Sequence, residues 1–162
     1  MYNKHILLFL IILVYIIPII MVYIQSKENT NSVSSIICNQ NIIFYLFIIL
    51  FCFLCIIYEV NRNDIMSCCY VVIIIIGICG VIFTKEGTII HNIIASIVFI
   101  TIICFMTHHS NDSELLQFLL FIQLVIIIIV AKEHYENKKI FGNESLLIIN
   151  FAIFYIYLHF TK

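Results

Sequence analysis

Long runs of isoleucine, leucine, valine and phenylalanine alternate with short polar patches along almost the whole chain. A spanning α-helix needs roughly 17–25 mostly apolar residues, because each residue rises about 1.5 Å across about 30 Å of hydrocarbon. The pattern therefore predicts an all-α fold, a polytopic transmembrane helix bundle that forms a single membrane domain over residues 1–162. About six runs satisfy the length requirement: 5–24, 42–58, 66–83, 89–106, 115–131 and 145–160.

The composition excludes an ordinary soluble domain. The 162 residues are 64% hydrophobic and only 10% charged, whereas an average soluble domain carries about 25% charged residues. Isoleucine favours strands in water, but inside lipid each backbone N–H and C=O must find a partner within its own segment, which a helix provides. The net charge is −1 and no basic cluster occurs, so we expect the lipid bilayer as a partner and no nucleic acid.

The first run predicts a retained helix and not a signal peptide. It extends over about 20 residues, longer than the 7–15 expected of a signal core, and no small-residue cleavage site follows it. Pro18 lies deep within this run and predicts a kink, because proline lacks a backbone donor. The longest connection, Gln25–Asn41, is polar and is expected to form a surface loop, and Lys132–Glu144 is the only charged loop of any size.

Polar residues inside the fourth run are the first candidates for a site. His91 and Asn92 lie in Gly87–Phe99 (GTIIHNIIASIVF), and Ala95 and Ser96 follow at helical spacing. Polar side chains in lipid usually turn toward the bundle interior. Two interpretations stay open: an intramembrane site that handles protons, or hydrogen bonding between helices at a place where small residues permit close approach.

Gln123 and Asn150 complete the candidate intramembrane polar site, together with the three residues above. Gln123 lies near the middle of the fifth run, Asn150 lies in the sixth, and both could form hydrogen bonds between helices, as could Gln117. No Asp, Glu, Lys or Arg falls in the middle of a run, which disfavours an ion-coupled transporter.

The groups near the ends of the runs predict no catalytic or metal site. Glu59 and Glu86 fall at helix ends on opposite faces of the bundle, so we expect solvated caps and not a pair of acting carboxylates. His108 and His109 are adjacent and should point in different directions on a helix, so a metal site with the terminal histidines His5 and His159 would need unusual convergence. No cofactor is expected.

The stretch Gly87–Phe99 resembles the fourth-helix signature of an uncharacterised family of six-helix integral membrane proteins, broadly similar to the DRAM/Sfk-type membrane proteins. In that signature a small residue and an apolar pair precede His-Asn or His-Asp, and an alanine and an aromatic residue follow. The resemblance places His91, Asn92 and Ala95 at the family's recurrent positions. It implies a multi-span protein with a role in lipid handling or membrane traffic, and the family has no settled enzymatic activity to carry over.

Three hypotheses for function follow. The first is a non-enzymatic multi-pass protein that organises membrane or binds other membrane proteins or itself. The alternatives are a small transporter or channel subunit that uses His91, Asn92 and Gln123, and a lipid-acting enzyme that uses His91 with Glu86. Several short runs favour a thin bilayer such as the endoplasmic reticulum. Residues with AT-rich codons abound, which is typical of a large DNA virus or a protozoan, and a viral chain would occupy a host membrane.

Overall fold

The computed structural model describes residues 4–25, 42–62, 64–85, 87–136 and 140–161, and all regular structure in these ranges is helical. The all-α prediction is confirmed. The six described helices are α1 (Lys4–Gln25), α3 (Ile42–Arg62), α4 (Ile65–Phe83), α5 (Ile89–Ser110), α6 (Glu114–Tyr135) and α7 (Phe141–Thr161). The surface loop predicted within Gln25–Asn41 falls almost entirely outside the described residues, as do the side chains of Pro18 and His5.

Most helix starts match the apolar runs, whereas half of the helix ends do not. Five of the six helices begin within one residue of the predicted run, and α7 begins four residues earlier than predicted. At their C-terminal ends α3, α5 and α6 each continue four residues beyond the run. The apolar run ends where the hydrocarbon ends, but the backbone continues as helix until its hydrogen bonds are replaced by other partners.

Three short connections begin the next helix with a capping side chain. Asp64, Thr88 and Ser113 precede α4, α5 and α6, and each accepts a hydrogen bond from the backbone N–H three residues further on. Such caps satisfy donors that have no partner inside the helix. Gly87 has a φ of 78°, which glycine adopts without strain, and so permits the tight turn between α4 and α5.

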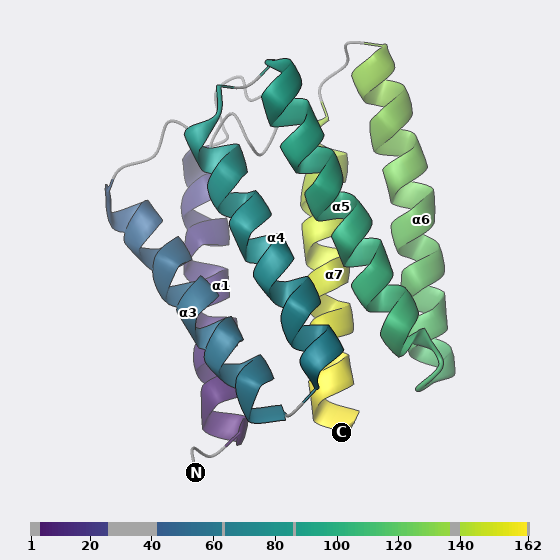
Figure 1. Cartoon of the computed structure of the whole chain (residues 1–162). Coiled ribbons are helices and arrows are strands. Elements are labelled where there is room, and N and C mark those ends of the chain that lie inside the picture. The colour runs from purple at the N-terminus through teal and green to yellow at the C-terminus, as the bar shows by residue number, and fades with distance from the viewer. Residues whose placement is uncertain (1–3, 26–41, 63, 86, 137–139, 162) are drawn as a thin grey trace.

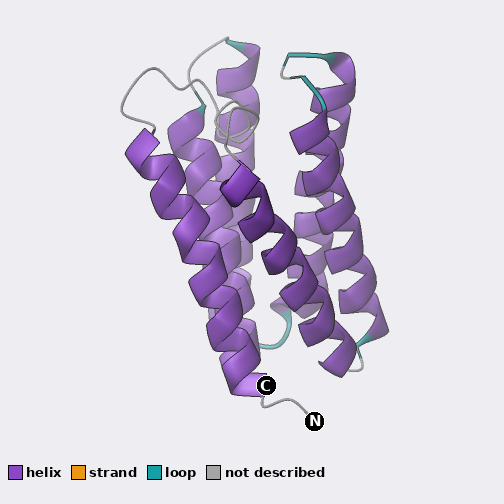
Figure 2. Ribbon diagram, turned by 90° about the vertical axis from the view of Figure 1, so that its left-hand side faces the viewer, coloured by secondary structure: helices purple, strands orange, loops and turns teal. Residues whose placement is uncertain are grey.

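Consecutive helices run in opposite directions, and both termini lie at the same end of the bundle (Figure 1). α5 packs against α4, α6 and α7, while α3 packs against α1 and α4. The view turned by 90° shows that the helices form one bundle in which they are tilted relative to one another (Figure 2). A cluster of buried side chains from all six helices fills the interior, and Phe105 and Phe154 at its centre have no exposed surface.

Two glycines of α4 lie directly against side chains of α5. A Cβ atom built on Gly77 would overlap Cγ2 of Val98, and one built on Gly80 would lie 3.0 Å from Cγ2 of Ile94. Small residues of this kind let the backbones of membrane helices come together.

The exterior of the bundle is largely apolar, and polar side chains are buried inside it beside the apolar core. Large apolar side chains such as Ile76, Phe121 and Ile128 are more than 60% exposed. Among the residues that the structure describes, nine polar ones are buried: Glu59, Ser67, His91, Thr101, His109, Ser110, Gln123, Asn150 and His159. This distribution suits a surface covered by lipid.

Five of the helices, α3 to α7, contain stretches long and apolar enough to cross a membrane. Several side chains of α1 fall outside the described residues, and α1 is not among these five. The structure therefore has the character of a membrane protein.

Candidate functional site

The candidate residues of α5 face opposite ways. His91 is buried, and its Nδ1 lies 3.1 Å from the hydroxyl of Thr84. Asn92 and Ser96 are exposed on the outer face, where the Ser96 hydroxyl donates to the backbone carbonyl of Asn92 at 2.8 Å. With Ile89, Ile93 and Ile97 these two residues line a shallow, open depression.

Gln123 and Asn150 lie together inside the bundle. The Asn150 amide donates to Oε1 of Gln123 at 2.7 Å and to the backbone carbonyl of Leu119 at 2.9 Å, which joins α7 to α6. The Nε2 of Gln123 is buried without a hydrogen-bond partner among the described residues. No hydrogen bond or ion pair within the described ranges links this pair to His91, so the structure separates the candidates into distinct places.

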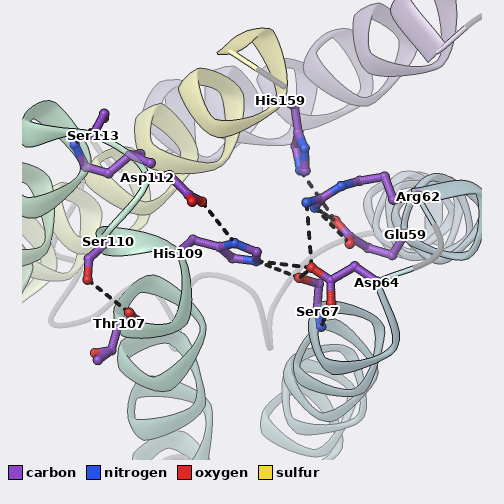
Figure 3. A network of polar contacts seen from close by, with 11 residues as sticks. Glu59, Arg62, Asp64, Ser67, Thr107, His109, Ser110, Asp112, Ser113 and His159 are labelled. Atoms are coloured by element: carbon purple, nitrogen blue, oxygen red, sulfur yellow. Dashed lines mark hydrogen bonds and ion pairs between the residues drawn. The ribbon is translucent and has the colours of Figure 1, made fainter.

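A larger polar network, hereafter the end network, lies at the end of the bundle where both chain termini are found. It contains Glu59, Arg62, Asp64, Ser67, His109, Asp112, Tyr155 and His159. These residues come from α3, α4, α5 and α7 and from the two turns that follow α3 and α5, as Figure 3 shows for most of them. Sequence reasoning did not identify it as a site.

Glu59 is the innermost member of the end network and is fully buried. Its Oε1 accepts a hydrogen bond from the Tyr155 hydroxyl at 2.6 Å and lies 3.4 Å from Nε2 of His159. Nη1 of Arg62, one helical turn further on, lies 3.1 Å from Oε2. The prediction of a solvated cap was wrong, because α3 continues past the apolar run and α7 covers the carboxylate.

Asp64 connects α3 to the start of α4. Its Oδ1 accepts from the Ser67 backbone N–H at 3.1 Å, and its Oδ2 accepts from the Ser67 hydroxyl at 2.8 Å. Nη2 of Arg62 lies 3.9 Å from the same Oδ2. Arg62 therefore lies between two carboxylates, one buried and one partly exposed.

Burial by itself would raise the pKa of the Asp64 carboxyl. The two hydrogen bonds from Ser67 and the nearby His109 and Arg62 outweigh that effect and hold this pKa below its ordinary value. Asp64 is therefore ionised at neutral pH and stabilises the folded state in that form.

The lowered pKa of Asp64 predicts a loss of stability in acid. A group whose pKa is lower in the folded state contributes stability above its unfolded value, about 3.9, and loses it as the pH falls through the folded value. In metal-free buffer the melting temperature of the wild type should fall below about pH 4 more steeply than that of Asp64→Asn. If the melting temperatures of the two proteins fell by the same amount between pH 7 and pH 3, this assignment would be contradicted.

His109 joins α5 to the network. It is buried, with Nε2 2.6 Å from the hydroxyl of Ser67 and Nδ1 3.6 Å from a carboxylate oxygen of Asp112. A serine, a histidine and an aspartate in this order resemble a nucleophilic triad. However, Ser67 has no exposed surface and its hydroxyl already donates to Asp64, so we interpret the arrangement as a structural link between α4 and α5.

Two members of the end network, together with the neighbouring His108, could hold a metal ion. Asp64, His108 and His109 each offer one ligand atom, and these atoms lie within 4.8 Å of one another. The rings of His108 and His109 lie close together, with centroids 4.7 Å apart, and the aspartate before α4 lies within reach of both. His159 lies beside Glu59 instead. Glu86, the proposed partner of His91 in a lipid-acting enzyme, lies outside the described residues.

One sequence signal could have indicated the network. Each of the polar groups Glu59 to Asp64 and His108 to Asp112 follows an apolar run by only a few residues, and both connections lie at the same end of an antiparallel bundle. Their meeting could be inferred from topology, whereas the burial of Glu59 could not.

No protein-family model, curated protein or solved structure matches the chain. The resemblance to DRAM/Sfk-type membrane proteins therefore stays a prediction.

Proposed function

We propose that the chain is a multi-pass integral membrane protein with six spans that acts without catalysis, by binding another transmembrane helix through the outer face of α5. The observation that carries the proposal is Asn92, whose exposed side-chain amide has no hydrogen-bond partner among the described residues. The surrounding depression is lined by isoleucines and by Ser96, whose small side chain leaves room for a neighbouring backbone.

The chemistry of asparagine favours a second copy of the same chain as the partner. An amide both donates and accepts hydrogen bonds, so two Asn92 side chains related by a two-fold axis can satisfy each other. Hydrogen bonds between membrane helices contribute about 0.6 kcal/mol on average and up to about 2 kcal/mol. Packing along the depression adds van der Waals contact.

Substitution of Asn92 by leucine tests this proposal. We expect Asn92→Leu to weaken self-association in lipid vesicles about 3- to 30-fold, the equivalent of about 0.6–2 kcal/mol. Energy transfer between labelled copies, measured as lipid dilutes the protein, gives the association constant. Gln117→Leu is the matched control, since Gln117 is also an exposed amide but lies on α6. Equal association of both variants and the wild type would reject the α5 interface.

The six-span arrangement has a separate test. Two fusion proteins would carry a glycosylation sequon on a spacer, one at the N-terminus and one at the C-terminus. Both or neither should be glycosylated, because six spans leave both termini on one side of the membrane. Modification of one fusion alone would contradict the arrangement. From the short apolar runs we propose the endoplasmic reticulum or another thin intracellular membrane as the location.

A proton-handling transporter is the second candidate, and the burial of Glu59 beside Tyr155 and His159 favours it. Acids and histidines inside a membrane bundle often form proton relays. Proton flux into vesicles that Glu59→Gln abolishes would favour transport over helix binding.

A further inference from the structure

We propose that Asp64, His108 and His109 form a binding site for a divalent transition-metal ion, with Zn²⁺ as the preferred ion. Nε2 of His109 lies 3.9 Å from Oδ2 of Asp64, and the ligand atom of His108 lies within 4.8 Å of both neighbours' ligand atoms. Two ligands on one tetrahedral Zn²⁺ are about 3.3 Å apart, given metal–ligand distances near 2.0–2.1 Å. The distances between the ligand atoms therefore need to shorten by only about 0.5–1.5 Å for an ion to bind.

The surroundings orient His109 for this role. Its Nδ1 faces the carboxylate of Asp112 at 3.6 Å, and metal-binding histidines commonly donate their second ring N–H to such a carboxylate. This leaves Nε2 directed toward Asp64. The ion would replace the contact between Nε2 and the Ser67 hydroxyl, while Ser67 keeps its hydrogen bond to Asp64.

The charge of the end network also favours a cation. Its described side chains include three carboxylates, Glu59, Asp64 and Asp112, but only one guanidinium, that of Arg62. Arg62 lies closer to Glu59, at 3.1 Å, than to Asp64, at 3.9 Å. A divalent ion near Asp64 would offset the excess of negative charge.

Access and ligand type point to the same class of ion. His108 is exposed and the Asp64 side chain is 29% exposed, so an ion can reach the ligands from the aqueous side of the bundle end. Two imidazoles with one carboxylate suit Zn²⁺ and its neighbours in the first transition row. Mg²⁺ and Ca²⁺ prefer oxygen ligands and should bind weakly.

The test is a calorimetric titration in which Zn²⁺ is added to the full-length, untagged protein in detergent. We expect the wild type to bind one ion per chain and His108→Ala to bind at least tenfold more weakly. His134→Ala is the matched control, because His134 is an exposed histidine at the opposite end of the bundle, and it should bind as the wild type does. Circular dichroism verifies that all three proteins are folded.

A second variant examines the supporting carboxylate. Asp112→Asn should weaken Zn²⁺ binding about 10- to 100-fold, the usual effect of removing a carboxylate that accepts a hydrogen bond from a ligand. In a separate measurement, Co²⁺ bound to the wild type should show visible absorption. Equal Zn²⁺ affinity of the wild type and His108→Ala would overturn the site, as would stronger binding of Mg²⁺ than of Zn²⁺. The readout is independent of self-association and so does not depend on the function proposed above.

Discussion

Glu59→Ala is expected to destabilise the bundle by about 3–5 kcal/mol, the range measured when one partner of a buried ion pair is removed. The substitution would leave Arg62 without its closest carboxylate and remove the acceptor of the Tyr155 hydroxyl. It would also end the contact with His159, and thereby the polar connection between α3 and α7. Unfolding by SDS titrated into a mild detergent, followed by circular dichroism, measures the loss.

Two further variants separate charge from hydrogen bonding at this position. Glu59→Gln retains an acceptor for Tyr155 but not the negative charge, so its effect should fall between those of the wild type and Glu59→Ala. Glu114→Ala removes an exposed acid from the first turn of α6, which should cost about 0.3–1 kcal/mol. If Glu59→Ala costs no more than Glu114→Ala, the end network does not hold the helices together.

Gly77→Ala should have the second largest effect, a loss of about 1–3 kcal/mol through overpacking. The added methyl group would overlap the side chain of Val98 on α5, and a β-branched valine in a helix has essentially one rotamer available. α4 and α5 would have to separate along their interface. The same SDS titration reports the free energy of unfolding.

Gly142→Ala is the matched control, and we expect this substitution to stabilise the protein where Gly77→Ala destabilises it. A Cβ atom at Gly142, the second residue of α7, meets no atom within 4 Å. Alanine there should stabilise the helix by up to about 1 kcal/mol, because alanine has the higher helix propensity. Equal effects at the two glycines would show that close packing of α4 on α5 does not matter.

The apolar runs were sufficient to predict the fold class, because hydrocarbon leaves the backbone almost no alternative to a helix. They did not locate the ends of α3, α5 and α6: α3, for example, continues through Glu59 to Arg62, where the two side chains form an ion pair. A hydropathy pattern describes the solvent around a segment, whereas helix boundaries also depend on caps such as Asp64, which begins α4.

The polar site was harder to predict than the fold. The hydrogen bond between Gln123 and Asn150 agrees with the expectation that these amides bond between helices. Asn92 faces outward although its neighbour His91 is buried. Because α5 is apolar on almost all sides, its sequence does not indicate which face lies inside the bundle. The burial of Glu59 depends on the position of α7, which is a property of the whole bundle.

The hydrogen bond between Tyr155 and Glu59 joins residues that are 96 positions apart in the chain. During synthesis α3 enters the membrane long before α7 exists, and in that interval Glu59 has only Arg62, on its own helix, as its partner within the end network. The carboxylate therefore gains its full set of contacts only when the last helix arrives. A chain that stops before α7 would therefore leave this acid without two of its three partners.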